Sequence, residues 1–276
     1  MEIAYFLPAW EVLSVYTLSL CWYYYPGITM NKRQQQILNY IASKHEIKVH
    51  ELTELLGVSG VTIRQDLALL QEQGFIRRVH GGALIQSEDE ISHRLSINYE
   101  AKKAIAEQAA KLVSTGETIF IEAGSVNALF ARCLPDELSL SVITNNVFIT
   151  RMLKESEMNV VLLGGIFQHQ SECVVGTLAQ MGLNTINFTK AFLGVDGISL
   201  ENGITGSDML RTEISSEVVK KSPQVFILSD SKKIGKTAMS KICNLSDVDY
   251  LITDSGIPEG VKEQLEKTGM TVIIAN

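Results

Sequence analysis

Polar and charged side chains follow several short apolar runs in the second half of the sequence, and their types suit a ligand rich in hydroxyl groups that carries a phosphate. A Gly-Ser pair ahead of a helix offers backbone N–H groups and the positive end of a helix dipole, and both bind phosphate. Amides and carboxylates can bind sugar hydroxyl groups, and a lysine can neutralise a phosphate dianion. The candidate ligand-binding residues are Glu122, Gly124, Ser125, Thr144, Asn145, Gly164, Gly165, Asp196, Gly197, Thr205 and Lys233.

The stretch from Leu56 to Leu70 has the pattern of a tight turn that leads into a helix. Gly57 suits the left-handed residue just past a helix end, and Ser59 suits the N-cap of the next helix. Apolar residues then recur at i, i+4 and i+7, as Ile63, Leu67 and Leu70, and predict one buried face. With a short amphipathic helix upstream, this pattern fits a helix-turn-helix or an ordinary helical hairpin about equally.

Residues 74–83 alternate apolar and basic side chains and end in a Gly pair, which predicts a small β-hairpin. Such a wing would lay its basic side chains along a phosphate backbone or in the minor groove of DNA. The face of the preceding helix that is opposite Ile63 would then meet the base edges. The candidate DNA-binding residues are Ser59, Val61, Thr62, Arg64, Gln65, Arg77, Arg78 and His80.

Seven short apolar runs, mostly separated by helical patterns, indicate the elements that must position the candidate ligand residues. Continuous β-branched runs are typical of strands buried on both faces, so we expect an α/β domain with a mostly parallel sheet. The runs are 118–121, 140–143, 160–163, 191–195, 225–228, 250–252 and 272–274. Ligands of such sheets collect at the carboxyl ends of the strands. No Gly-x-Gly-x-x-Gly or Walker motif occurs, so we expect no nucleotide cofactor.

The charge of the chain is unevenly distributed over its 276 residues and its net value of −7. Residues 30–83 contain seven Lys/Arg and five Asp/Glu, whereas residues 84–276 contribute −7 and residues 1–29 contribute −2. A mildly basic N-terminal segment joined to an acidic remainder suits a protein that contacts DNA with one part only. We therefore expect a DNA-binding domain at 30–83, an acidic linker at 84–100 and the α/β domain at 101–276.

The residues from Val58 to Ala83 resemble the N-terminal winged helix of the DeoR family of bacterial transcription regulators. The matching residues are Val58-Ser59, Thr62-Ile63-Arg64, Asp66-Leu67, Gly74 and Arg78-Val79-His80-Gly81-Gly82-Ala83. The family usually has a second basic residue where this chain has Gln65. Because Gln pairs best with adenine and Arg with guanine, the resemblance implies a DNA-binding function with a different base preference at that position.

The second half of the chain resembles the DeoR-type C-terminal sensor domain, whose fold is shared with ribose-5-phosphate isomerase and glucosamine-6-phosphate deaminase. The match includes Gly124, Thr144-Asn145, Gly164-Gly165, Gly194-Val195-Asp196-Gly197, Glu213, Asp230-Ser231 and Lys233, and it adds Glu213 to the ligand candidates. Residues 122–126 read Glu-Ala-Gly-Ser-Val where the family has Asp-Ser-Gly-Thr-Thr or Asp-Ala-Gly-Thr-Thr, and residues 207–211 also depart from the family. The expected effector therefore differs in shape from the commonest ones.

Residues 1–29 differ in composition from the remainder, with both tryptophans and no Lys or Arg. They lack the positive n-region and small-residue cleavage site of a signal peptide. Pro8 and Glu11 interrupt the apolar stretch, which leaves a span that is short for a membrane helix. Because Met30 opens a stretch that looks like the start of the family's first helix, we interpret residues 1–29 as upstream sequence translated from a wrongly chosen start. A membrane anchor is the alternative.

The resemblance implies a regulator, with repression as the expected mode, that controls a carbohydrate-metabolism operon in response to a phosphorylated sugar. The alternative is a sugar-phosphate isomerase or deaminase-like enzyme with an attached DNA-binding module, and its acid–base candidates would be Glu122, Asp196, Glu213 and Lys233. A membrane-tethered sensor is a third class, motivated by residues 1–29 alone. Expected partners are double-stranded operator DNA, the sugar phosphate and further copies of the chain, as a dimer or tetramer, with no membrane. The four cysteines form no C-x-x-C pair, so we expect neither a metal nor a disulfide and assign the chain to the cytoplasm.

Overall fold

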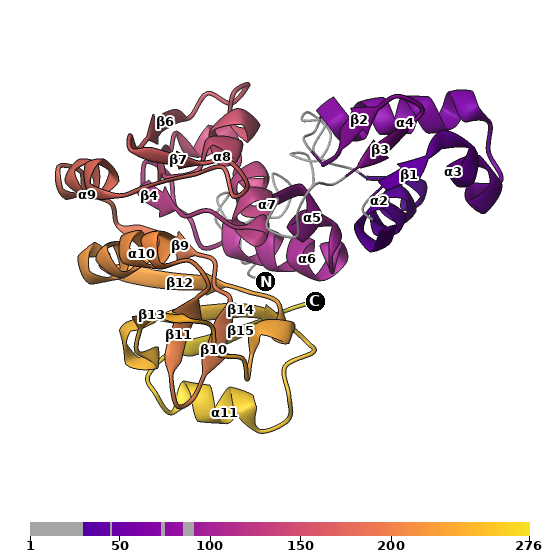
Figure 1. Ribbon diagram of the computed structural model, residues 1–276. Helices are drawn as coiled ribbons and strands as arrows, with labels where there is room; N and C mark the ends of the chain where they lie inside the picture. Colours follow the sequence, from indigo (N-terminus) through magenta and orange to yellow (C-terminus); the bar gives the residue numbers. More distant parts are fainter. Residues whose placement is uncertain (1–29, 45, 73–74, 85–90) are drawn as a thin grey trace, which may run out of the picture.

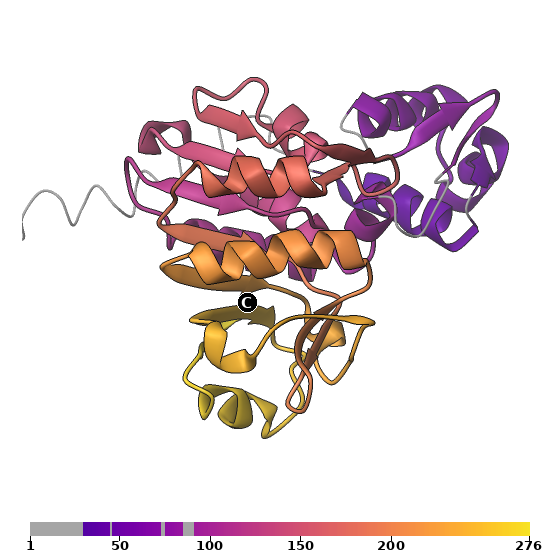
Figure 2. The ribbon, with the colours of Figure 1, turned by 60° about the vertical axis from the view of Figure 1, so that its left-hand side comes forward.

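The computed structural model describes residues 30–276 except 45, 73–74 and 85–90. The expectations for residues 1–29 and for the centre of the acidic stretch lie outside these described residues. The described part has a small helical and wing-bearing unit at one end and a larger α/β unit, which Figures 1 and 2 show from two sides. No described helix is long and apolar enough to cross a membrane.

The helix-turn-helix is confirmed. It consists of α3 (Val49–Leu56) and α4 (Gly60–Glu72), and α4 packs on both α3 and α2 (Lys32–Lys44). Gly57 is left-handed, with φ 66°, and its N–H donates to Thr53 O at 3.0 Å. Ser59 Oγ accepts the N–H of Thr62 at 3.2 Å, as an N-cap does. Ile63, Leu67 and Leu70 are all buried, as their spacing predicts.

Asp66, also on α4, is buried although the sequence pattern does not predict it. Its Oδ2 lies 2.6 Å from Arg33 Nε, and its Oδ1 accepts the side-chain amide of Gln34 at 3.0 Å. Both partners belong to α2, so this acidic residue attaches the recognition helix to the first helix of the unit.

The wing is an antiparallel hairpin of β2 (Arg77–Val79) and β3 (Gly82–Leu84). A third strand that the sequence did not reveal, β1 (Glu46–Lys48), pairs with β3. A Cβ at Gly82 would lie 2.4 Å from Ile47 O, so this pairing requires a residue without a side chain.

Part of the segment expected to be a linker is helical. Residues Ile91–Ser96 form α5, and α6 (Tyr99–Ala110) begins two residues earlier than expected. Ile91 and Leu95, four positions apart, are buried, and α5 contacts both α2 and α7 (Ser125–Cys133). Burial of this apolar pair explains why the segment after the acidic stretch is ordered into a helix instead of extended chain.

The expected parallel sheet is confirmed, and it has seven strands. They are β4 (Thr118–Ile121), β5 (Ser141–Thr144), β6 (Asn159–Leu162), β9 (Lys190–Leu193), β12 (Gln224–Leu228), β14 (Tyr250–Asp254) and β15 (Thr271–Ala275). Their order is β15-β14-β12-β9-β4-β5-β6, and every pairing is parallel. The chain leaves β4 towards β6 and then returns to build outward from β9, so the direction of winding reverses between β4 and β9.

Helices cover both faces of the sheet. One face packs against α6, α7 and α8 (Val147–Met152), and the other packs against α9 (Thr177–Asn184), α10 (Met209–Lys221) and α11 (Val261–Glu266). In Figure 2, α9 and α10 lie across the front of the sheet. On the first face, stacked rings join neighbouring strands: the Phe192 and Phe226 centroids are 4.8 Å apart, and those of Phe226 and Tyr250 are 4.6 Å apart.

Two small antiparallel sheets and three short 3-10 helices complete the described fold, and the sequence patterns did not predict them. The first of these sheets is a hairpin of β7 (Ile166–Gln168) and β8 (Cys173–Val175). The other sheet contains β10 (Gly197–Ser199), β11 (Gly203–Gly206) and β13 (Ser240–Cys243). The 3-10 helices are η1 (Asp136–Leu138), η2 (Ser231–Lys233) and η3 (Leu245–Asp247).

Candidate functional site

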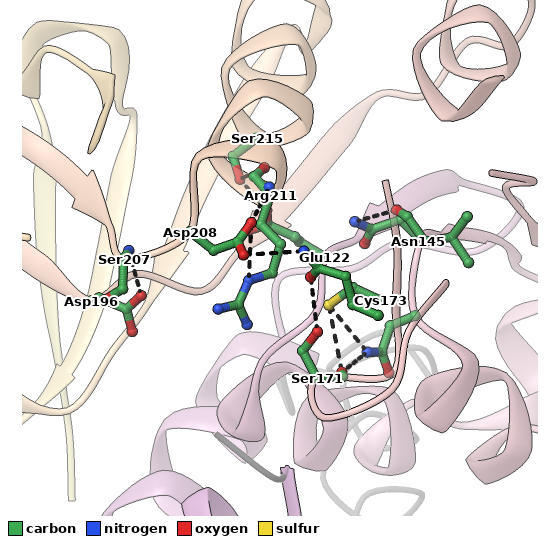
Figure 3. A network of polar contacts seen from close by, with 12 residues as sticks. Glu122, Asn145, Ser171, Cys173, Asp196, Ser207, Asp208, Arg211 and Ser215 are labelled. Carbon is green, nitrogen blue, oxygen red and sulfur yellow. Dashed lines mark hydrogen bonds and ion pairs between the residues drawn. The ribbon is translucent and has the colours of Figure 1, made fainter. Parts of the chain in front are cut away.

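A charged cleft opens at the carboxyl ends of β4, β5 and β9, beside the point where the winding reverses. Open α/β sheets bind their ligands at such a point. The residues that line it are Arg94, Glu122, Ala123, Asn145, Gly194, Val195, Asp196, Gly206, Ser207, Asp208, Arg211, Thr212, Ser215 and Ile242. Figure 3 shows several of these side chains converging from different strand ends and from the start of α10.

Asp196 holds two cations at the cleft. Its Oδ1 lies 3.4 Å from Arg94 Nη2 and 3.6 Å from Lys233 Nζ, and its Oδ2 accepts the N–H of Ser207 at 2.9 Å. Burial alone would raise the pKa of this carboxyl, but Arg94, the Ser207 bonds and Lys233 outweigh burial and hold the pKa below its usual value. Asp196 is therefore an anion around which positive charge collects.

The start of α10 contributes a second pair of charges. Asp208 is the N-cap of α10, and its Oδ1 accepts the N–H of Arg211 at 2.9 Å. Arg211 Nε lies 3.8 Å from the same oxygen, and Gln168 Nε2 donates to Asp208 Oδ2 at 3.1 Å. The guanidinium of Arg211 is thus held at the cleft by the residue that begins its own helix (Figure 3).

The carboxyl of Glu122 is buried at the end of β4. Burial raises the pKa of its carboxyl to about 8, which outweighs the opposing effects of Ser215 and Arg211. The Ser215 hydroxyl contacts Glu122 Oε1 and lies 2.9 Å from Arg211 O. A hydroxyl has one hydrogen, so Ser215 can donate either to Glu122 Oε1 or to Arg211 O at one time. Within the described residues, Glu122 Oε2 has no hydrogen-bond partner.

The amide of Asn145 is oriented by its neighbours. Its Oδ1 accepts the N–H of Ala123 at 3.3 Å, and its Nδ2 donates to Val174 O at 3.5 Å. Asn127 donates to Glu122 O at 2.9 Å and to Phe192 O at 3.2 Å, and so ties the ends of β4 and β9 together. These bonds keep the cleft wall in place.

The cleft also reaches the connection to the winged helix through Arg94, which belongs to α5. Lys102 on α6 is buried and donates through Nζ to Arg94 O. Burial lowers the pKa of Lys102 to about 7, although Asp230 opposes that shift. On its other side, α5 accepts a hydrogen bond at Ser96 O from Gln35 of α2, at 3.4 Å.

The structure brings together part of the predicted ligand set. Glu122, Asn145 and Asp196 line the cleft, and Lys233 stands beside Asp196. Gly124 and Ser125 are buried at the N-terminus of α7, directly after Ala123 of the cleft wall.

Other predicted ligand residues lie elsewhere or have structural partners. Thr144 Oγ1 accepts the N–H of Asn146, while Thr205 Oγ1 donates to Gly197 O and accepts the N–H of Ala238. Glu213 is exposed on α10, near Gln180 of α9. Gly164 and Gly165 are exposed in the connection between β6 and β7. None of these residues lines the cleft.

Sequence reasoning missed Arg94, Ser207, Asp208, Arg211 and Ser215, all of which line the cleft. An Asp directly ahead of a helical pattern is a sign of an N-cap and could have located the start of α10. No local pattern singles out Arg94, because its partner Asp196 is 102 positions away.

The predicted DNA-contacting residues lie on α4 and the wing, and most are exposed. Val61 is 63% exposed, and Arg64, Gln65, Arg77, Arg78 and His80 are exposed as well. The Thr62 hydroxyl is 2.9 Å from that of Ser59, so these two side chains are partly engaged in capping α4. In Figures 1 and 2 this unit stands at the end of the molecule, away from the bulk of the sheet.

A winged helix with an exposed recognition helix, joined through two helices to an α/β domain with a charged cleft, is the architecture of a ligand-controlled transcription regulator. Comparison with family models gives the same class. The DeoR-like helix-turn-helix domain matches residues 33–89, and the DeoR C terminal sensor domain matches residues 97–255. The chain belongs to the DeoR family of transcription regulators, as its sequence predicts, and not to a family of enzymes.

Relatives match the chain over nearly its whole length. The HTH-type transcriptional regulator YulB of Bacillus subtilis (strain 168) is 36% identical over 242 residues, which are 86% of this chain and 93% of the relative. The "Putative aga operon transcriptional repressor" of Escherichia coli O157:H7 is 30% identical over 251 residues, 88% of this chain and 93% of the relative. Among solved structures, the match to ribose 5-phosphate isomerase A from Methanocaldococcus jannaschii covers 50% of this chain and 55% of the isomerase chain. The sequence identity is 21% and the TM-score is 0.36.

Proposed function

We propose that this chain represses a carbohydrate-metabolism operon and that a phosphorylated sugar bound in the cleft controls its release from operator DNA. The observation that carries the proposal is the gathering of Arg94, Arg211 and Lys233 around Asp196 and Asp208 at the strand ends. Cations can neutralise a phosphate dianion, while carboxylates accept hydrogen bonds from sugar hydroxyl groups. A relative that is named as a repressor of the aga operon supports a carbohydrate operon as the target.

The phosphate is assigned to the cations of the cleft and to the N-terminus of α7, which directly follows Ala123 of the cleft wall. The N-cap of α7 is Gly124, which has no side chain that could cap the first turn of the helix. Backbone N–H groups at such a helix start favour an anion. Sugar hydroxyl groups are assigned to Asp196, Asn145 and the unpartnered Oε2 of Glu122.

Control of DNA binding follows from the position of Arg94. This residue reaches the cleft from α5, and α5 packs on α2 of the winged helix. A ligand anion that competes with Asp196 for Arg94 weakens the ion pair that holds α5 to the cleft. Such a ligand can alter operator affinity only by as much as it prefers one arrangement of α5 over another, typically about 1–3 kcal/mol.

On the DNA side, Thr62, Arg64 and Gln65 are assigned to base edges, and Arg77, Arg78 and His80 are assigned to the backbone or minor groove. Winged-helix regulators of this kind read two half-sites, so the active form is assigned as at least a dimer. A repressor of chromosomal operators acts where the chromosome is, which makes the cytoplasm its compartment.

The test is thermal unfolding and operator binding over a panel of sugar phosphates, each compared with its unphosphorylated parent. One phosphorylated member should raise the melting temperature and change operator affinity, whereas its parent does neither. At a concentration of about 100 times its dissociation constant, an effector stabilises the folded chain by roughly 2.7 kcal/mol.

The control pair is Lys233→Ala and Lys236→Ala. Lys233 stands beside Asp196, whereas Lys236, three residues on, is exposed. The first substitution should abolish both responses, and the second should leave both intact. A parent sugar that acts as well as its phosphate, or a normal response of the Lys233 variant, would contradict the proposal.

A further inference from the structure

Exposed large apolar side chains gather at one edge of the α/β domain. Six of the fourteen such side chains among the described residues belong to β6, β7 and α9. They are Val161, Leu162, Ile166, Phe167, Leu178 and Met181, and we call the surface around this edge the β6–α9 face. Because neighbouring side chains of a strand point to opposite sides, this surface includes both sides of the edge. Figures 1 and 2 show these three elements beside one another at the β6 edge of the sheet.

On the α9 side of the edge, the β6–α9 face is continuous from β7 to α9. A Cβ added at Gly176, the N-cap of α9, would lie 3.3 Å from Ile166 Cδ1 of β7. A Cβ at Gly182, within α9, would lie 3.4 Å from Leu163 Cδ2 at the end of β6. Since α9 thus touches both β7 and the end of β6, its outward residues Leu178 and Met181 extend the same apolar surface. Exposed apolar patches of this kind mark interaction sites.

The strand β6 forms an open edge of the seven-stranded sheet. In the described part of the chain it pairs with β5 alone, and its sequence, Asn-Val-Val-Leu, contains neither a charge nor a proline. Natural proteins usually protect an edge strand with lysine, proline or a covering element. At the opposite edge, β15 has no large apolar side chain that is exposed. The unprotected edge therefore lies within the apolar face.

Charge is nearly absent from the segment that builds this face. From Met158 to Thr189 the sequence contains one Asp, Glu, Lys or Arg, which is Glu172. The carboxylate of Glu172 lies 2.7 Å from Arg151 Nη2, so its charge is compensated. Interface cores are depleted of charged residues in this way.

We propose that the β6–α9 face is where two copies of this chain associate about a two-fold axis. At such an axis a surface meets itself, so any charge near it faces the same charge of the second copy. An uncharged surface is compatible with its own copy for that reason. A peripheral membrane contact would instead call for basic residues around the apolar ones, and the segment from 158 to 189 has none. The inference goes beyond the proposed effector and does not depend on it.

The experiment measures the mass of the full chain in solution by sedimentation velocity and light scattering. The test variant carries Leu178→Lys and Met181→Lys, at side chains that are 66% and 59% exposed. The matched control carries Leu200→Lys and Met239→Lys, at side chains outside the face that are 50% and 72% exposed. Both variants exchange one Leu and one Met for the same charges, so they differ only in location.

We expect the unaltered chain to have twice the protomer mass of 30.5 kDa, or four times if a second interface exists. The test variant should fall to half the assembled mass, with a dissociation constant raised by roughly tenfold or more, and the control should not. A monomeric unaltered chain, an intact assembly in the test variant, or equal dissociation of the control would overturn the proposal. Circular dichroism checks that the test variant is folded. If it is not, Ile166→Lys on β7 takes its place with the same expected loss of mass.

Discussion

Arg94 Nη2 lies 3.4 Å from Asp196 Oδ1, although the two residues are 102 positions apart in the chain. The contact joins α5, which packs on the first helix of the winged helix, to the centre of the charged cleft. Both side chains are largely covered, at 26% and 23% exposed, so the contact is not an ordinary surface ion pair.

Removing this contact should separate effector binding from DNA release. With Arg94→Ala we expect operator binding in the absence of effector to persist, because Arg94 is not on the DNA-facing surface. The coupling free energy between effector binding and operator binding is typically about 1–3 kcal/mol. In the variant this coupling should fall to less than half of its value in the unaltered chain. Fluorescence anisotropy with labelled operator, with and without the effector, measures the change. Arg94→Lys keeps the charge and should restore part of it; a full response of the alanine variant would contradict this role.

Gln65 and Arg78 should affect DNA binding in different ways. Gln65→Ala should relax selectivity at one base position, by roughly 1–3 kcal/mol, because an amide reads base edges. Arg78→Ala should weaken all sequences alike and reduce the slope of log affinity against log salt by about one unit. Binding to a set of single-base operator variants at several salt concentrations separates the two effects. An unchanged preferred site in the Gln65 variant would mean that another face of α4 meets the bases.

Loss of the Asp66 carboxylate should loosen α4 from α2. Asp66→Ala removes the acceptor of Arg33 and of Gln34, and Gln34 is itself buried. A buried donor left without a partner costs about 1–3 kcal/mol. Because Arg33 is about a third exposed, water compensates part of its loss, so the lower half of that range is expected. Hydrogen exchange of the α4 amides should show the change. Glu54→Ala, at an exposed acid on α3, is the control and should leave the exchange rates as they are.

The pH dependence of stability should reveal the raised pKa of Glu122. Burial raises its pKa in the folded chain from 4.5 to about 8, so the folded chain holds a proton that the unfolded chain releases. This stabilisation is complete below about pH 4.5 and is lost as the pH rises towards about pH 8, by about 1.4 kcal/mol per pH unit. Glu122→Gln does not titrate. The free energy of unfolding of the unaltered chain, minus that of the variant, should therefore fall between about pH 5 and about pH 8. A difference that does not vary with pH would rule out the raised pKa.

Periodicity in the sequence predicts the elements of this fold well where burial is regular. All seven strands of the parallel sheet coincide with apolar runs. Helices cover both faces of the inner strands, whereas β6 at the edge is apolar but largely exposed. The helix-turn-helix was equally accessible, since Gly57 and Ser59 mark its turn through backbone conformation and capping. The short strands β1, β7 and β10 were missed because each has only three residues, too few to show alternation.

The cleft was less accessible from the sequence. Glu122, Asn145 and Asp196 were found because they stand at or shortly after strand ends, and strand ends meet at one edge of a parallel sheet. Arg94 and Arg211 reach the cleft from helices, and a helix pattern does not say which exposed side chain points at a distant loop. Gly164 and Gly165 follow a strand but lie at the edge of the sheet, where the strand order carries them away from the cleft.

The short helix α5 has a consequence for building hybrid regulators from this chain. A new sensor domain can be joined to an existing winged helix at many points, but Arg94, which lies between the two matched domains, contacts Asp196 within the sensor domain. A junction placed after Ser96 would give Arg94 of one parent to the cleft of another, and the hybrid would bind both DNA and sugar without connecting them. A junction placed before Ile91 keeps the arginine with its own aspartate, and only there should operator and effector specificities be interchangeable as separate parts.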